Sequence, residues 1–137
     1  MPKNLKKKQE RSGRKRVDIL TINQLRQYRK IKGRKLLLED EFDELTLKIQ
    51  AIENKDPDKA EISRNERDKL QKDIEYLKQR LDAVEAYLRR CDEYVEVMLR
   101  MRYIDGKTWT AIAMKQGGKN TNDSVRKQCH RYVAKNP

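Results

Sequence analysis

The sequence predicts an all-α fold, a long helical hairpin or coiled coil followed by a three-helix helix-turn-helix unit. Hydrophobic residues make up 36% of the 137 residues and charged residues 41%, a balance typical of long helices with narrow apolar stripes. Only five Gly and three Pro interrupt the chain, which favours helix over a β-rich fold. Apolar residues also recur at heptad spacing along two long stretches of the chain.

The net charge of +12 is concentrated at the two ends of the chain. Residues 1–35 hold fourteen Lys/Arg against two acidic residues, a net +12, and residues 101–137 hold eight against two, a net +6. The segment 36–100 is acidic, with twelve Lys/Arg against eighteen Asp/Glu, a net −6. Basic ends indicate a polyanionic partner, whereas the lysines of the middle segment fit a solvated helix face.

Residues 1–16 are expected to form a disordered basic arm, because the segment has almost nothing apolar to bury and repels itself. It acts either as a solubilising tail or as an arm that binds nucleic acid. The cations that would then contact phosphates are Lys6, Lys7, Lys8, Arg11, Arg14, Lys15 and Arg16.

Residues 17–91 are expected to form an antiparallel helical hairpin or coiled coil. The pattern is interrupted at residues 54–58, where Pro57 disfavours helix for the residue before it, and a capping box at Ser63–Glu66 predicts the second helix start. Gly33 is expected to mark a bend or a break in the first helix. The two stripes could also pair between copies, with Lys35 or Cys91 specifying register. The stripes are Tyr28, Ile31, Lys35, Leu38, Phe42, Leu45, Ile49 and Ile52, then Leu70, Ile74, Leu77, Leu81, Val84, Leu88, Cys91 and Val95.

Residues 92–137 are expected to form three helices, at roughly 93–104, 108–116 and 122–134. Thr108 is a candidate N-cap, Gly117 and Gly118 a helix stop, and Thr121 and Ser124 candidate caps of the last helix. That helix has an apolar face of Val125, Cys129 and Tyr132, and a basic face opposite. An apolar inner face and a basic outer face after a tight turn are typical of a helix-turn-helix.

Catalytic, cofactor and metal sites are not expected. His130 is the one histidine, and a neighbouring Cys129 points elsewhere on a helix; no zinc-ligand pair, phosphate-binding loop or dinucleotide motif occurs. No apolar run is long enough to cross a membrane, and no signal peptide is recognisable. We therefore expect a non-enzymatic, soluble intracellular protein with free thiols.

The string RYIDGKTW at residues 102–109, followed by Ile112-Ala113, Val125-Arg126 and His130-Arg131-Tyr132, resembles the C-terminal half of ArpU/RinA-type late-gene regulators of phages of Gram-positive bacteria. Their helix-turn-helix is similar to region 4 of bacterial sigma factors. The turn is longer here, since Gly118 follows Gly117 and Val125 comes about two residues late. The resemblance places the following residues near double-stranded DNA: Thr121, Asn122, Asp123, Ser124, Arg126, Lys127 and His130. Phosphate or guanine contacts are expected from Arg126, Lys127 and Arg131.

Together with the basic last helix, this resemblance implies a sequence-specific DNA-binding transcriptional regulator of phage or prophage genes, with the last helix in a major groove. It also implies a location in the cytoplasm of a bacterial host cell. One alternative is a small terminase-like DNA-packaging protein that assembles into a ring. Another is a coiled-coil adaptor that binds RNA polymerase or another protein without DNA specificity. A homo-oligomer formed through the coiled coil is compatible with each. The operator, the sign of regulation and the oligomeric state are left open by the sequence.

Overall fold

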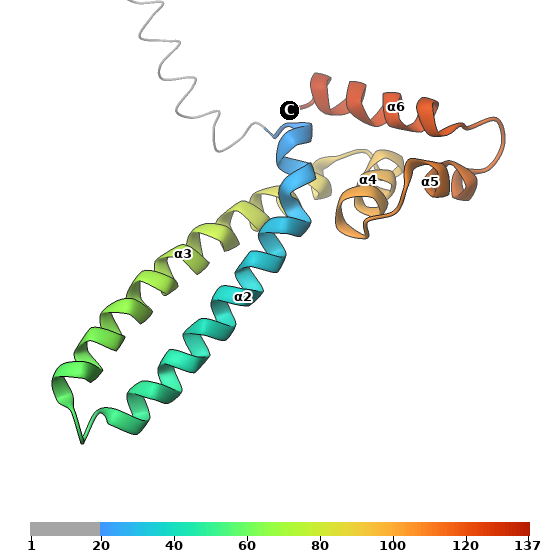
Figure 1. Cartoon of the computed structure of the whole chain (residues 1–137). Helices are drawn as coiled ribbons and strands as arrows, with labels where there is room; N and C mark the ends of the chain where they lie inside the picture. The colour runs from blue at the N-terminus through green and yellow to red at the C-terminus, as the bar shows by residue number, and fades with distance from the viewer. Residues whose placement is uncertain (1–19) are drawn as a thin grey trace, which may run out of the picture. The chain divides into compact units, whose positions relative to one another are not determined.

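The computed structural model describes residues 20–137, and this part of the chain contains helices and no strands (Figure 1). The all-α fold predicted from the sequence is confirmed. A widened π-helical turn, η1, directly continues α4. The elements are α2 (Ile22–Ile52), α3 (Pro57–Arg90), α4 (Glu93–Leu99), η1 (Arg100–Ile104), α5 (Trp109–Gln116) and α6 (Asn122–Lys135).

Two compact units divide the chain. Unit 1 combines the described residues 20–29 with Ala83–Pro137, and unit 2 is Lys30–Asp82. The helix-turn-helix segment therefore belongs to a unit that also takes in the first turns of α2 and the last turns of α3. In the described residues no helix is long and apolar enough to cross a membrane.

Unit 2 is an antiparallel pair of helices, formed by the larger parts of α2 and α3 (Figure 1). The expected start of the second helix at Ser63 is wrong: α3 begins at Pro57, and Ser63 is buried inside it. Asp56 caps this helix by accepting from the backbone N–H of Lys59 at 3.1 Å. Proline suits the first helical position, because its missing N–H has no partner there anyway. The break that was one of the two expectations for Gly33 is also absent, since α2 runs through this residue.

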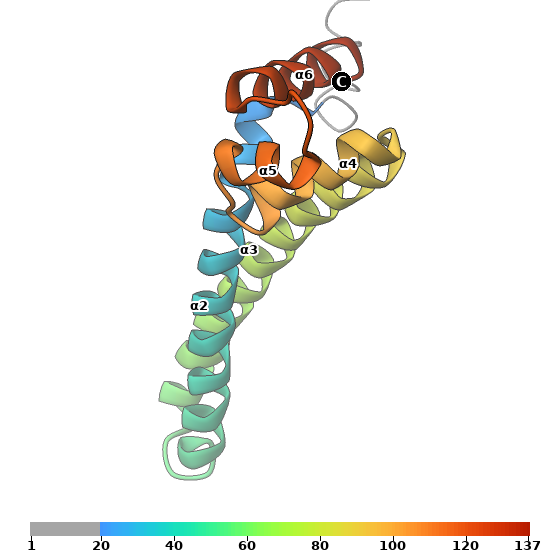
Figure 2. The same cartoon turned by 90° about the vertical axis from the view of Figure 1, so that its right-hand side faces the viewer.

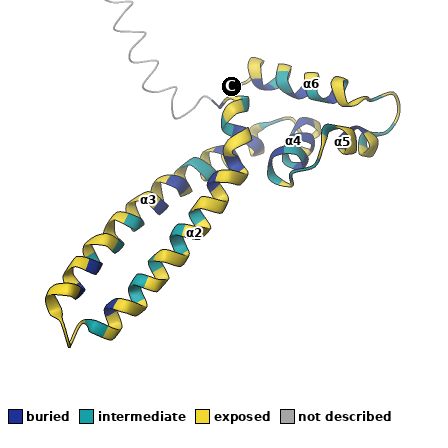
Figure 3. Cartoon of the chain, in the orientation of Figure 1, coloured by how far each residue is buried: buried dark blue, intermediate teal, exposed yellow. Residues whose placement is uncertain are grey.

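Both predicted heptad stripes are confirmed as the seam within the long helices, where every stripe residue is buried or half-buried. The last two positions of the second stripe lie beyond α3, because this helix ends at Arg90: Cys91 follows it and Val95 belongs to α4. Ile49, Ile74 and Leu77 are buried within unit 2, whereas Leu45 and Leu70 are half-buried. Figure 3 shows buried and half-buried positions alternating with exposed ones along both long helices. Several large apolar side chains lie outside the seam and stay exposed, namely Leu36, Leu37, Leu47, Ile62 and Tyr76. Unit 2 thus has a narrow core and much uncovered apolar surface.

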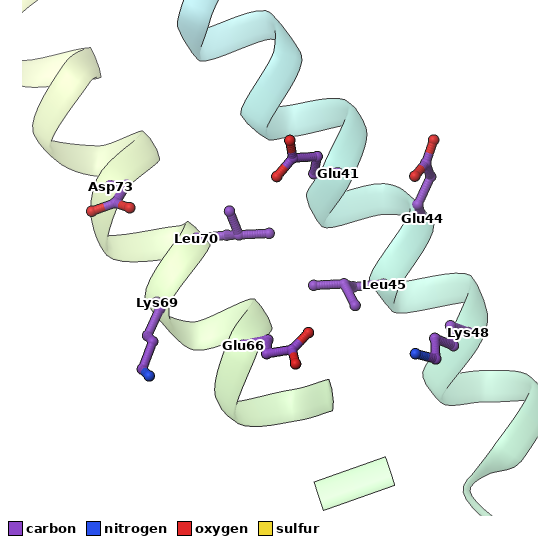
Figure 4. A pocket seen from close by; sticks show the side chains of 8 residues that line it. All are labelled: Glu41, Glu44, Leu45, Lys48, Glu66, Lys69, Leu70 and Asp73. Carbon is purple, nitrogen blue, oxygen red and sulfur yellow. The ribbon is translucent and has the colours of Figure 1, made fainter. Parts of the chain in front are cut away.

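A shallow hollow of about 440 Å³ lies between the helices of unit 2 (Figure 4). Leu45 and Leu70 face each other across it. Charged side chains of both signs surround these two leucines, namely Glu41, Glu44, Lys48, Glu66, Lys69 and Asp73. The rim is typical of the charged flanks of a heptad seam.

Unit 1 contains the larger core. Its fully buried side chains come from α2 (Leu25), α3 (Leu88), α4, α5 and α6, so these five α-helices share one interior. Fully burying one leucine contributes on the order of 2 kcal/mol to folding. A unit of residues 92–137 alone would lose Leu25 and Leu88. The remaining fully buried residues are Met98, Leu99, Ile112, Val125 and Cys129.

Polar contacts tie the ends of the elements of unit 1 together. Arg100 of η1 donates to Glu85 of α3 at 2.9 Å and to Glu96 of α4 at 2.8 Å. The hydroxyl of Tyr87 donates to the carbonyl of Asn136 at 2.7 Å. These bonds hold α4 and the end of α6 against α3.

Candidate nucleic-acid interface

The helix-turn-helix consists of α5 and α6 with five residues, 117–121, between them. Thr108 caps α5 by accepting from the N–H of Ala111 at 3.1 Å, in the predicted position. Gly117 and Gly118 end the helix with φ of +70° and +65°, a region that favours glycine. The side chain of Asn120 donates to the carbonyl of Gly117 at 3.1 Å and closes the turn.

Thr121 and Ser124 form a reciprocal capping box at the start of α6. The Thr121 hydroxyl accepts from the Ser124 N–H at 3.1 Å, and the Ser124 hydroxyl accepts from the Thr121 N–H at 3.0 Å. The Asn122 side chain donates to the Thr110 hydroxyl at 3.3 Å. The first turns of α5 and α6 are therefore adjacent, and both carry the partial positive charge of a helix N-terminus.

The inner face of α6 consists of Val125, Cys129 and Val133, all buried. Tyr132, which the sequence assigned to this face, is half-buried, and its hydroxyl accepts from the N–H of Asp92 at 3.0 Å. Burial and the neighbouring Cys91 raise the pKa of Cys129 to about 12, so this thiol stays protonated at neutral pH.

The outer face of α6 brings together part of the predicted DNA-binding set. Lys127 and Arg131 are exposed on the same side of the helix, one turn apart. Thr121, Asn122 and Asp123 are exposed at its N-terminal end, while Ser124 is half-buried by its capping bonds. This face offers hydrogen-bond donors and positive charge to an anionic partner.

Arg126 is half-buried, and its guanidinium donates to the carboxylate of Asp123 at 2.9 Å. That ion pair lowers the pKa of Asp123, with a smaller contribution from Lys127. Because the pair lies at the surface, it stabilises the fold only weakly. Asp123 neutralises Arg126 here, so Lys127, Arg131 and, in the last turn, Lys135 supply the uncompensated charge of α6.

His130 lies apart from Lys127 and Arg131, on the side of α6 that faces α5. Its ring packs edge-on against Trp109, with 6.1 Å between ring centroids. Its Nε2 is buried and has no hydrogen-bond partner among the described residues. Burial lowers the pKa of His130, and the charges of Arg26 and Arg126 lower it further, so the ring is neutral at pH 7.

Gln128 is an exposed residue of the outer face that the sequence pattern did not identify. It follows Lys127 in the sequence and lies beside Arg131 on the helix surface, one helical turn after Ser124. The i, i+3 spacing of Gln128 and Arg131, which places both on one face of a helix, is the sequence signal that could have identified Gln128. A glutamine can bind adenine through two hydrogen bonds in the major groove.

The seven predicted cations of the basic arm, between Lys6 and Arg16, lie outside the described residues. Across residues 20–137 no three His, Cys, Asp or Glu side chains are grouped so that they could hold a metal ion. Cys91 and Cys129 are free thiols, as the sequence predicted.

Comparison of the chain with protein-family models, with curated proteins and with solved structures finds no match in any of the three.

Proposed function

We propose that this protein is a sequence-specific DNA-binding transcriptional regulator of phage or prophage genes, acting in the host cytoplasm. The observation that carries the proposal is the outer face of α6, where Lys127, Gln128 and Arg131 are exposed together behind a capped N-terminus. A helix of this kind, braced by a preceding helix across a short turn, fits the major groove of B-form DNA.

The residues of α6 have different roles in this proposal. Arg131 and Gln128 reach base edges, since their side chains can make two parallel hydrogen bonds to guanine and adenine respectively. Lys127 and the N-terminal residues Thr121 and Asn122 contact phosphates, which positions the helix but reads no sequence. The basic arm adds phosphate contacts of its own.

The test begins with selection of bound sequences from random duplex DNA by the full chain. Gel-shift titrations on the selected site then compare the wild type with Gln128→Ala and with Lys127→Ala/Arg131→Ala. We expect the double variant to lose site-specific binding, and Gln128→Ala to relax preference at one base pair by about tenfold or more. Circular dichroism checks that helicity is retained.

The control is Lys72→Ala/Lys78→Ala, which removes two exposed lysines from unit 2. It should bind the selected site like the wild type. Failure of the wild type to enrich any sequence, or equal affinity of all variants, would refute the proposal. Duplex binding without sequence preference, in a ring-shaped oligomer, would favour the packaging alternative, and no duplex binding at moderate salt would favour the adaptor.

Self-association through unit 2 is a further part of the proposal. Leu37, Leu47 and Ile62 are each at least 60% exposed there, and the seam around Leu45 and Leu70 is only half-buried. A second copy could cover this surface with an identical one, as two-fold oligomers do. Light scattering across a concentration series should show a mass above one chain, and Leu37→Gln/Leu47→Gln should lower it.

A further inference from the structure

A group of five cations in unit 1 forms a basic cluster outside α6. They come from the first turns of α2, from η1, from the loop before α5 and from the last turn of α5. Figure 2 shows the start of α2 close to α6, and the N–H of Leu20 donates to the carbonyl of Pro137 at 3.0 Å. The basic cluster is Arg26, Arg29, Arg102, Lys107 and Lys115.

A chain of direct contacts makes these residues one surface. The Arg29 guanidinium lies against the backbone of Gly106, which precedes Lys107. Arg102 donates to the carbonyl of Lys107 at 3.1 Å and stacks over the Trp109 ring at 5.5 Å. The ammonium of Lys107 is near enough to Lys115 to lower the pKa of Lys115.

Arg26 connects the basic cluster to α6. Its charge acts both on the hydroxyl of Tyr103 and on His130 of α6. Trp109 links Tyr103 to His130, because its ring makes a T-shaped contact with each of theirs. The basic cluster therefore borders the edge of α6 that Arg126 and His130 occupy.

The basic cluster has almost no counter-charge within the described residues. None of its five members makes an ion pair there, whereas the nearby Arg100 is paired with both Glu85 and Glu96. Asp105 is the carboxylate that acts on Lys115, and its effect is smaller than that of Lys107. Grouping like charges is unfavourable in the isolated protein, and a polyanion that neutralises them removes the repulsion.

We propose that the basic cluster contacts the phosphates of the same DNA duplex that α6 reads, so that the start of α2 is part of the DNA-binding surface. This inference rests on the proposed function. DNA phosphates fit because they form an extended row of anions, which matches cations spread over several elements rather than converging on one point. Arg29, Arg102 and the Thr108 cap hold this surface in a fixed shape.

The experiment measures the affinity of the full chain for its selected duplex over a series of salt concentrations. The variant is Arg26→Gln/Arg29→Gln/Lys107→Gln/Lys115→Gln. For each phosphate that the variant no longer neutralises, the slope of log K against log salt should become shallower by about 0.9. Affinity at low salt should fall at least about tenfold, while the preference for the selected site over a scrambled one is unchanged, because phosphate contacts carry no sequence information.

The matched control is Lys59→Gln/Lys69→Gln/Lys72→Gln/Lys78→Gln, which removes the same charge from exposed positions of unit 2. Its salt slope should equal that of the wild type. A second variant, Lys107→Gln/Lys115→Gln, leaves α2 unchanged and should show an intermediate slope, and Arg26→Lys/Arg29→Lys should keep the wild-type slope. Thermal unfolding verifies that each variant is folded.

The outcomes separate this inference from the proposed function. If the wild type binds its selected site and the basic-cluster variant has the slope and affinity of the control, the inference is wrong and the proposed function stands. If the wild type binds no duplex, both are wrong. An acidic protein surface is then the remaining partner for the basic cluster.

Discussion

The guanidinium of Arg29 occupies the space that a side chain on Gly106 would need. Arg29 lies near the start of α2, and Gly106 forms the turn after η1 with φ of +76°. The turn follows directly from the widened end of η1, where the N–H of Lys107 donates to the carbonyl of Met101 at 2.9 Å. The contact of the Arg29 guanidinium with the backbone of Gly106 thus joins α2 to the helix-turn-helix segment.

We expect Gly106→Ala to destabilise the protein by about 1–2 kcal/mol, because an alanine Cβ is strained at positive φ and must displace Arg29. Gly33→Ala is the matched control. Gly33 is exposed inside α2 with no atom near its Cβ position, so alanine should raise stability by about 0.5–1 kcal/mol. Urea unfolding followed by circular dichroism measures both. Equal effects of the two substitutions would contradict the turn geometry.

The sequence predicted the repetitive parts of this fold well. Heptad spacing identified both stripes of the seam between α2 and α3, because a helix that buries one stripe must repeat apolar residues every three or four positions. Thr108, Gly117 and Thr121 marked the ends of α5 and α6, since caps depend on local backbone groups that the neighbouring residues supply.

Other features depend on tertiary contacts or on an ambiguous local signal. The pattern around Pro57 indicates a helix breaker, although proline serves equally as a first helical residue. The sequence groups His130 with Lys127, but the position of Trp109 across the turn decides which side of α6 is covered. The full burial of Leu25 in unit 1 had no local signal, because the rest of that unit, Ala83–Pro137, is distant in sequence.

Arg100 and Glu85 provide a second test of how the elements of unit 1 are joined. The Glu85 carboxylate accepts from Arg100 at 2.9 Å and from the Tyr28 hydroxyl at 3.3 Å, and both charged side chains are about 30% exposed. Glu85→Gln should lower the free energy of unfolding by about 1 kcal/mol, since partly buried charged hydrogen bonds are stronger than exposed ones.

The control for this pair is Glu61→Gln, which breaks the exposed ion pair of Glu61 with Arg64 in unit 2. Such a pair contributes about 0–0.5 kcal/mol, so its removal should be close to neutral. Most of the effect of Glu85→Gln on the free energy of unfolding should remain when about 0.5 M salt is added, because the partly buried pair is poorly screened. An effect of Glu61→Gln as large as that of Glu85→Gln would be inconsistent with this assignment.

Cys129 should be inert towards thiol reagents in the folded protein. Its side chain is fully buried, and burial raises its pKa to about 12, whereas the reactive form is the thiolate. In Cys91→Ser at pH 8, we expect alkylation at a rate limited by opening of unit 1, rising steeply with urea. Rapid labelling of this variant without urea would show that Cys129 is accessible.

The raised pKa of Cys129 also makes the free energy of unfolding depend on pH in the alkaline range. In the unfolded chain the thiol ionises near pH 9, and in the folded protein it ionises only near pH 12. Between these values the unfolded state releases a proton that the folded state retains, so the free energy of unfolding falls as pH rises. Cys129→Ala should remove this part of the alkaline decline, while leaving a small cavity.

His130 gives the opposite pH dependence, in a range where no thiol titrates. Burial, Arg26 and Arg126 lower its folded pKa below the 6.5 of an ordinary histidine. Below pH 6.5 the unfolded chain therefore takes up a proton that the folded protein takes up only at lower pH. Stability is complete above pH 6.5 and falls as the pH is lowered towards the folded pKa.

We expect His130→Gln to flatten the profile of unfolding free energy between pH 8 and pH 5.5, since glutamine does not ionise there. Carboxylates that titrate at lower pH are common to both proteins, so the difference between their profiles isolates His130. Parallel profiles would mean that His130 is freely solvated and not held against Trp109.

Arg26 both lowers the His130 pKa and belongs to the basic cluster, so Arg26→Gln should raise the folded pKa of His130 towards 6.5. A smaller gap between the folded and unfolded pKa makes the acid-side decline in unfolding free energy shallower. Direct titration of the His130 ring by NMR measures the same change in the folded state. An unaltered His130 pKa in Arg26→Gln would contradict the placement of Arg26. A raised pKa would support that placement without any DNA, because the charge of Arg26 acts on His130 only when the start of α2 lies beside α6.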